Sequence, residues 1–102
     1  MSTFDDRETG FEAKFAHDSQ MQFKAEARRN KLLGLWAAEI MGHDNPDAYA
    51  LEVIKSDFEE AGDEDVYRKV AGDLGDRADE ATIRAKMAEL MGVAKEQLMT
   101  EI

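Results

Sequence analysis

Three cationic side chains stand within four residues of one another in a chain that is otherwise strongly acidic. They are Arg28, Arg29 and Lys31, and the only tryptophan, Trp36, follows five residues later. A guanidinium binds phosphate through parallel hydrogen bonds, and an indole ring offers a face on which a base can stack. These four residues are therefore a candidate site for the phosphates and base of a nucleotide. Two other interpretations stay open, namely salt bridges to the acidic remainder of the protein and docking onto an acidic partner.

The remaining polar residues form no recognisable catalytic or metal-binding pattern. His17 and His43 are each followed by an aspartate, but 26 residues separate them, which matches no helical ligand motif. The chain has no cysteine, which excludes thiol catalysis, disulfides and cysteine-based zinc sites. It also lacks a glycine-rich phosphate loop and a nucleophile paired with a base. We expect a protein that is not an enzyme and that requires no metal or cofactor.

A further set of candidate residues lies at the N-terminus. Phe4, Phe11 and Phe15 recur at i, i+7 and i+11, which places the three rings on one face of a helix. Gly10 interrupts this segment at a cost of about 1 kcal/mol relative to alanine, and a short helix so weakened is marginal by itself. We therefore expect residues 1–18 to be a mobile, partly helical arm that becomes ordered on a partner. The alternative is that the rings pack on the protein's own bundle.

Helices must position these residues, and the apolar periodicity predicts four of them. They are expected over residues 20–41, 46–61, 64–74 and 80–100, and the apolar stripe of the first is expected to include Phe23. Asn45 and Pro46 are a cap and a first residue for the second helix, while Gly42 and Gly75 end the first and third. Short connections then predict an all-α fold, a small antiparallel four-helix bundle over residues 19–102. Residues 25–31 are polar, so we expect them to stand clear of this bundle.

Composition limits the class of protein. The 102 residues are enough for one domain, and 23 acidic against 13 basic residues give a formal net charge of −10. Most of this charge lies in residues 42–102, which hold 7 basic and 16 acidic groups. An acidic body repels phosphate, so we expect no nucleic acid partner. The N-terminus lacks a basic and an apolar region, and no apolar run approaches a membrane span, so we expect a cytoplasmic protein without membrane insertion.

Four segments extend over nearly the whole chain and closely resemble one family. The segments are FDDRETGFEAKFAHD, FKAEARRNKLLGLWAAEIMG, DFEEAGDEDVYRKVAGDL and DEATIRAKMAEL. They resemble the zeta subunit family, the small inhibitors of the rotary ATP synthase of alphaproteobacteria. Gly10 departs from the family pattern, in which a better helix former stands at this position.

The resemblance implies a mechanism and a set of partners. Members look like four-helix bundles whose N-terminal arm wedges into a catalytic α/β interface of the synthase head near the γ subunit, which blocks ATP hydrolysis. The arm here is residues 1–18, with eight residues matching the partner-binding segment: Phe4, Asp5, Asp6, Arg7, Glu8, Phe11, Lys14 and Phe15. Members are also thought to bind ADP or ATP as a regulatory ligand. The expected protein is monomeric when free and is peripheral to the inner membrane through the synthase.

Two other functions fit the residues without the resemblance. One is a regulatory sensor that binds adenine nucleotide and acts on a different partner. The other is a generic helical adaptor whose arm packs on its own bundle.

Overall fold

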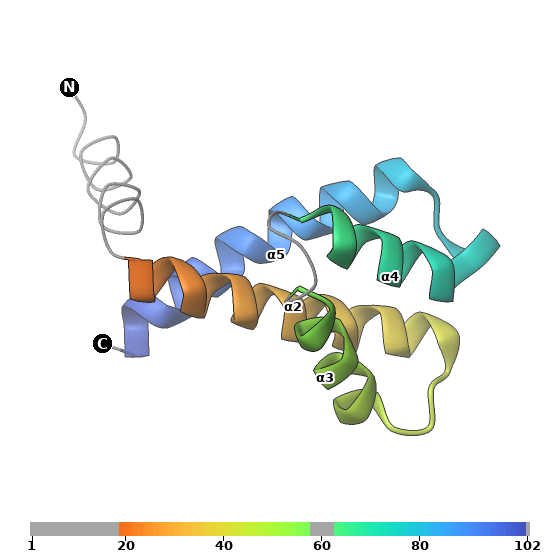
Figure 1. Ribbon diagram of the computed structural model, residues 1–102, viewed down its shortest axis with the longest axis horizontal. Coiled ribbons are helices and arrows are strands. Elements are labelled where there is room, and N and C mark those ends of the chain that lie inside the picture. The colour runs from red at the N-terminus through yellow and green to blue at the C-terminus, as the bar shows by residue number, and fades with distance from the viewer. Residues whose placement is uncertain (1–18, 58–62, 102) are drawn as a thin grey trace.

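The computed structural model describes residues 19–57 and 63–101, and these residues form an all-α fold with four α-helices. Helices α2 (Ser19–Met41) and α5 (Glu80–Glu101) are long, whereas α3 (Pro46–Ser56) and α4 (Glu64–Leu74) are short. A 3₁₀ turn, η1 (Gly75–Arg77), precedes α5. Successive helices run in opposite directions (Figure 1), as expected for an antiparallel bundle.

Helix α2 ends where the sequence predicts, at a glycine. Gly42 has a φ of +65°, a conformation in which a side chain would be strained. The His43 amide donates to the Ala38 carbonyl at 2.9 Å, and the Gly42 amide donates to the Glu39 carbonyl at 3.2 Å. These two bonds form a Schellman motif and satisfy carbonyls that the helix end leaves without a partner.

Helix α3 begins as predicted but ends earlier than predicted. The Asn45 side chain accepts a hydrogen bond from the Ala48 amide, and Pro46 is the first helical residue. The helix ends at Ser56, because the Asp57 amide returns to the Ile54 carbonyl in a tighter turn. The predicted extension to residue 61 is therefore wrong at Asp57, and its residues 58–61 lie outside the described part of the chain.

The start of α5 depends on a cap that the sequence did not single out. The Asp79 carboxylate accepts a hydrogen bond from the Thr82 amide at 2.8 Å, which is the N-cap geometry. Upstream, Gly75 has a φ of +57° and ends α4, as predicted. The chain reverses between these two residues, so α5 returns along the bundle.

Helix α2 is the element on which the other helices are assembled, since it packs against α3, α4 and α5. The main core joins residues of all four helices, among them Leu33 of α2, Val53 of α3, Val70 of α4 and Ile83 of α5. Gly34 lies at the crossing of α2 and α3, where an added Cβ would stand 2.5 Å from the Ala50 Cα. The two backbones therefore approach closely because neither crossing residue is large.

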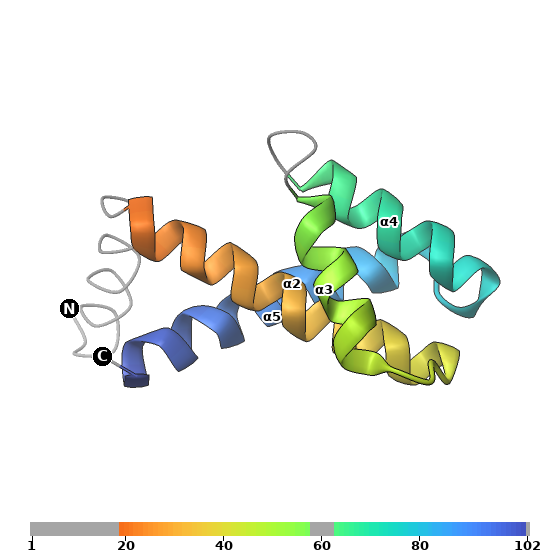
Figure 2. The ribbon, with the colours of Figure 1, turned by 60° about the horizontal axis from the view of Figure 1, so that its bottom comes forward.

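The beginning of α2 and the end of α5 extend together beyond the two short helices (Figures 1 and 2). A separate small core holds this extension, built from Met21 and Ala25 of α2 and Leu98 of α5. Among the residues that the structure describes, the extension therefore consists of α2 and α5 alone. The N-terminal segment joins the protein here, at Ser19.

Two expectations about packing are wrong. Phe23 does not belong to the inner stripe of α2, since 58% of its surface is exposed. The polar residues 25–31 do not stand clear of the bundle, because Arg29 and Asn30 are 2% and 0% exposed. Both expectations rested on whether the side chain is polar or apolar. Burial depends instead on the direction in which it points, and Phe23 points away from the core whereas Arg29 points into it.

Candidate functional site

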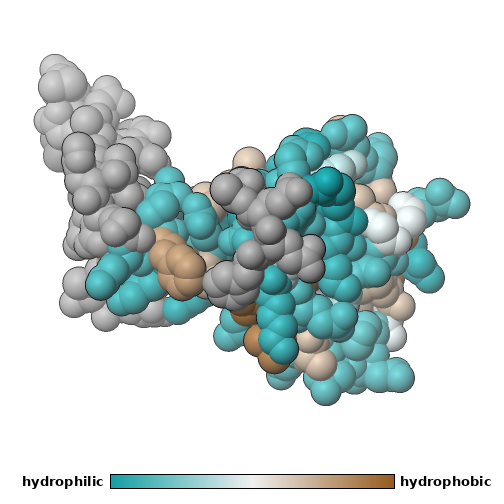
Figure 3. Space-filling model, viewed as in Figure 1, coloured by the Kyte–Doolittle hydropathy of each residue, from teal (hydrophilic) through white to brown (hydrophobic). Residues whose placement is uncertain are grey.

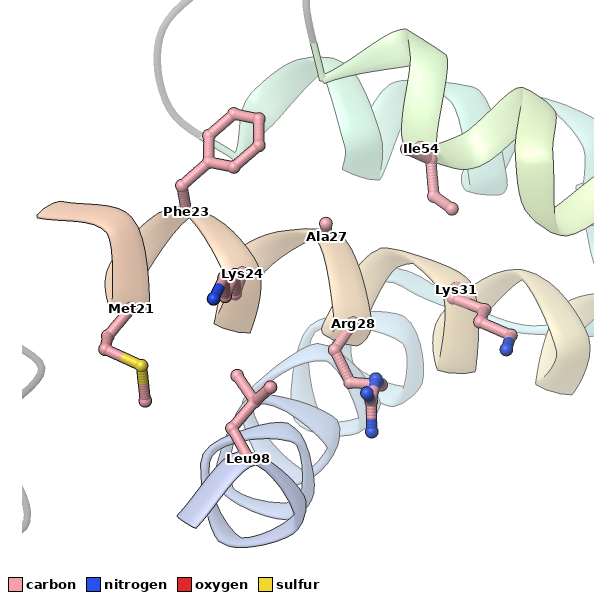
Figure 4. Close-up of a pocket in the computed structure, with 8 residues that line it drawn as sticks. All are labelled: Met21, Phe23, Lys24, Ala27, Arg28, Lys31, Ile54 and Leu98. Carbon is pink, nitrogen blue, oxygen red and sulfur yellow. The ribbon is translucent and has the colours of Figure 1, made fainter. Parts of the chain in front are cut away.

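A groove with a volume of about 560 Å³ runs along the first half of α2. We call it the α2 groove. Six residues of α2 line it, with one residue each from α3 and α5: Met21, Phe23, Lys24, Ala27, Arg28, Lys31, Ile54 and Leu98. Figure 4 shows the three cations along α2, between Ile54 on one side and Leu98 on the other. The groove thus combines apolar walls with positive charge.

The spacing of the cations explains why they share one surface. Lys24, Arg28 and Lys31 follow one another at intervals of four and three residues, which is the repeat of one helix face. The Arg28 guanidinium also donates to the Gln97 side chain of α5 at 2.8 Å, which holds it over the groove. None of the described residues that line the groove carries a carboxylate, although the protein as a whole is acidic. Its chemistry therefore favours an anionic or acidic ligand that also carries an apolar part.

The surface around the groove carries apolar patches on α2 and on α3. Figure 3 shows apolar colour over the first half of α2 and over α3, within a surface that is otherwise mostly hydrophilic. Phe23 and Leu51 are the most exposed large apolar residues of the described chain, at 58% and 50%. A neighbouring groove shares Lys31 and Ile54 with the first and adds Leu51. The apolar surface therefore continues from α2 onto α3.

Next to this surface, Arg29 lies in a buried polar network. Its Nε donates to the Asn30 side chain at 2.7 Å, and a terminal nitrogen donates to the Asp63 carboxylate at 2.9 Å. The Asn30 amide nitrogen in turn donates to the Asp57 carboxylate at 3.1 Å. The network thus links α2 to the end of α3 and the start of α4. Asp63 immediately precedes α4, but its carboxylate accepts a hydrogen bond from Arg29 and makes no capping bond.

The Asp57 carboxyl has an unusual environment in this network. Partial burial raises its pKa above the ordinary value, the Glu26 and Asp63 charges add to that rise, and the Asn30 hydrogen bond and Arg29 charge oppose it. Burial therefore outweighs the groups that favour the ionised form. The arrangement is typical of a structural polar network, because its members bind one another, although Arg29 and Asp63 also line an open groove of about 460 Å³.

The structure brings only two of the four predicted nucleotide residues together. Arg28 and Lys31 line the α2 groove, whereas Arg29 is engaged in the buried network. Trp36 packs against the main core, and the Lys86 ammonium lies 5.7 Å from its ring centre. Arg29 and Trp36 therefore do not face the groove that holds Arg28 and Lys31. The eight predicted partner-binding residues of the arm lie outside the described residues.

Comparison with known proteins assigns the chain to a family. The family model of the ATPase inhibitor subunit zeta matches residues 1–97, which is nearly the whole sequence. The chain belongs to this zeta subunit family. The chain is similar to a solution NMR structure of a protein with 63% sequence identity, with a TM-score of 0.74. The alignment covers 80% of this chain and 99% of the NMR structure's chain. A search of curated proteins found no match.

Membership in the zeta family supports the resemblance seen in the sequence and the regulatory character expected from it. The described residues hold no cluster of three or more histidine, aspartate or glutamate side chains placed for a metal ion. None of the described helices is long and apolar enough to span a membrane.

Lys24 and Phe23 are the groove residues that sequence reasoning missed. Lys24 precedes the dense cationic run by four residues, and Phe23 was assigned to the core. The signal that identifies Lys24 is its helical spacing from Arg28 and Lys31, because residues four and seven apart share a face. No signal in the sequence indicates that Phe23 faces outward. Met21 and Phe23 are both large and apolar, so side-chain type alone does not tell which of them is buried.

A second polar cluster lies at the opposite end of α2. The Tyr49 hydroxyl donates to the Asp73 carboxylate at 2.8 Å, and the Lys69 ammonium lies 2.8 Å from the same carboxylate. Burial raises the pKa of Tyr49, and the Asp73 bond and charge add to that rise. The pKa of Asp73 is lowered, since burial opposes ionisation but is outweighed by hydrogen bonds from Lys69 and Tyr49 and by the Lys69 and His43 charges. This cluster connects α3 to α4.

Proposed function

We propose that this zeta family member inhibits ATP hydrolysis by the rotary ATP synthase. Residues 1–18 are the inhibitory segment, which inserts at a catalytic interface between the α and β subunits near γ. The helical bundle is the mount that carries this segment. The protein would act from the cytoplasm, peripheral to the inner membrane through the synthase, as a regulator and not as an enzyme.

The observation that carries this proposal is the extent of the family match. The match to the inhibitor family begins at residue 1, so it includes the Phe-striped segment as well as the bundle. The geometry of the mount agrees with the proposal. The segment continues directly into α2, and α2 is the helix against which the other three pack. Because the inserted segment is joined to α2, a force on it acts on the helix that contacts α3, α4 and α5.

The chemistry of the segment also supports insertion between subunits. Phe4, Phe11 and Phe15 supply large apolar anchors, and aromatic anchors in desolvated pockets carry much of the energy of protein interfaces. Asp5, Asp6, Arg7, Glu8 and Lys14 surround them with charge that orients an encounter. A segment of this size that orders on binding loses conformational entropy, so the anchors must offset that cost.

The test is ATP hydrolysis by the cognate synthase head with increasing amounts of full-length protein. The full chain is compared with a chain starting at Ser19 and with Phe4→Ala/Phe11→Ala/Phe15→Ala. Leu51→Ala is the matched control, because it removes an exposed apolar side chain from the bundle. We expect inhibition by the full chain and the control, and its loss in the other two. Equal inhibition by the chain starting at Ser19 would move the function to the bundle, and no inhibition by any form would refute the proposal.

A second candidate function is binding of ADP or ATP as a regulatory ligand. The observation that favours it is the α2 groove, where three cations stand beside the exposed Phe23 ring. Cations bind the phosphates, and the ring offers a face for the base. Calorimetric titration with ADP tests it, with Lys24→Ala/Lys31→Ala expected to weaken binding at least about tenfold. Lys55→Ala, an exposed lysine outside the groove, should leave ADP binding unchanged.

A further inference from the structure

The α2 groove presents positive charge that is not paired within the described part of the protein. Lys24 and Lys31 are exposed, and neither has a carboxylate within ion-pair distance among the residues that the structure describes. Five other cations do pair with carboxylates, namely Arg29, Arg68, Lys69, Arg84 and Lys86. Because the chain carries a net charge of −10, a positive row of this kind favours a partner with negative charge.

The dimensions of the row fit an extended partner better than a small anion. From Lys24 through Arg28 to Lys31, the cations advance along α2 by about 10 Å at 1.5 Å per residue. The groove as a whole extends from Met21 to Lys31, which is about 15 Å by the same rise. A second helix has this rise as well, so carboxylates spaced three and four residues apart on it meet each cation in turn. A helix of about three turns therefore matches both the charges and the length of the groove.

The apolar walls of the groove specify the inner face of such a helix. Ile54 of α3 and Leu98 of α5 stand on opposite sides of the cations (Figure 4), and Phe23 adds an exposed ring near the start of α2. Within the described residues, the extension holds only α2 and α5, so a helix laid in the groove would contact both of them and the end of α3. Helices join bundles in this way, with an apolar stripe facing inward and charges along its edges.

Three other occupants fit these charges less well. Groove-to-groove contact with a second copy would bring two rows of cations together, and like charges repel. An anionic lipid surface would also meet Asp47, which lines the adjoining groove, and the acidic surface of the protein beyond it. The phosphates of a nucleotide are adjacent to one another, so they would engage only part of a row that runs along the helix. An acidic helix is the occupant that uses the whole row.

We propose that the α2 groove is a docking site for an acidic amphipathic helix of a partner protein. The apolar stripe of the partner helix packs between Ile54 and Leu98, and carboxylates beside that stripe pair with Lys24, Arg28 and Lys31. The site belongs to the bundle, so this inference goes beyond the inhibition assigned to residues 1–18 and does not depend on it.

Synthetic peptides of defined charge test the proposal on the full-length protein. The glutamate probe is an amphipathic helix of about 14 residues, with leucines on one face and three glutamates beside them at spacings of four and three residues. Two matched probes replace the glutamates with lysines or move them to the opposite face. Fluorescence anisotropy of the labelled peptides at about 0.15 M salt measures binding. We expect the glutamate probe to bind at least about tenfold more tightly than either matched probe.

Charge reversal places the binding in the groove. Lys24→Glu/Lys31→Glu should weaken binding of the glutamate probe about tenfold or more, because each change replaces an attraction with a repulsion. The same variant should bind the lysine probe more tightly than the wild type does, a gain that unfolding would not produce. Lys55→Glu/Arg77→Glu makes an equal charge change at exposed residues that line neither the α2 groove nor its neighbour. This control should leave binding of the glutamate probe within about twofold of the wild type.

The other occupants give distinguishable results. Sedimentation of the free protein detects a second copy, and titrations with ADP and with phosphatidylglycerol vesicles detect a nucleotide and a lipid surface. Equal binding of the three peptides would overturn the proposal, as would a control variant that weakens binding as much as the groove variant does. The proposal also fails if one of these other occupants binds and is lost in Lys24→Glu/Lys31→Glu while the glutamate probe does not bind the wild type.

Discussion

The crossing of α2 and α3 provides the sharpest test of the packing, through Gly34→Ala. An alanine Cβ at this position would stand 2.5 Å from the Ala50 Cα, 3.1 Å from its Cβ and 3.3 Å from its nitrogen. Carbon atoms in favourable contact lie about 3.5–4.0 Å apart, so the helices must separate by roughly 1 Å. The nearest atom belongs to the backbone, which means that no side-chain rotation relieves the clash.

The magnitude follows from two opposing effects. Overpacking a well-packed site costs about 1–3 kcal/mol, whereas alanine is favoured over glycine inside a helix by about 1 kcal/mol. Because the clash is with backbone, the overpacking cost lies in the upper part of that range, at about 2–3 kcal/mol, so we expect Gly34→Ala to lower the free energy of unfolding by about 1–2 kcal/mol. For a chain of this size, that lowers Tm by about 5–10 °C.

Matched controls exist within the same protein. Gly72 in α4 and Gly92 in α5 have no atom within 4 Å of an added Cβ. Gly72→Ala and Gly92→Ala should each raise the free energy of unfolding by about 0.5–1 kcal/mol. Thermal and urea unfolding, followed by circular dichroism, measure all three variants. The reasoning is refuted if Gly34→Ala is as stable as the wild type or if the three variants shift stability in the same direction.

Two further predictions concern the polar clusters. Arg29→Lys should lower the free energy of unfolding by about 1–3 kcal/mol in urea titrations, because an ammonium lacks the planar fork that bonds Asn30 and a carboxylate together; an unchanged midpoint would contradict this. The pKa of Asp73 is lowered in the folded protein, so its stabilisation is present above the unfolded pKa of about 3.9 and is lost as pH falls through the lower, folded value. Asp73→Asn should therefore be less stable than the wild type at pH 7 and should approach it below about pH 4; a constant difference across this range would show that charge is not the cause.

The sequence by itself determined the helices and most of their ends. Periodic apolar residues bury one face of a helix, and Asn45, Pro46, Gly42 and Gly75 act on bonds within a few residues of themselves. These signals are local, so they can be read without knowing what packs where. The end of α3 was misplaced, since the Asp57 amide returns to the Ile54 carbonyl there, while the Asp57 carboxylate accepts a hydrogen bond from Asn30, which is 27 residues away in the chain. The resemblance to the zeta family also came from sequence and was confirmed by the family match.

Only the tertiary structure decided which polar and aromatic side chains face inward. Arg28 and Arg29 are adjacent and chemically identical, yet one lines a groove and the other is buried against Asn30 and Asp63. Successive residues on a helix differ in direction by about 100°, so the orientation of α2 in the bundle fixes their roles. Among the glycines that the structure describes, only Gly34 has the backbone of another helix within reach of an added Cβ, whereas Gly92 in α5 has open space there. The burial of a side chain and the approach of two helices depend on distances between helices. The spacing of residues along one helix gives no information about those distances.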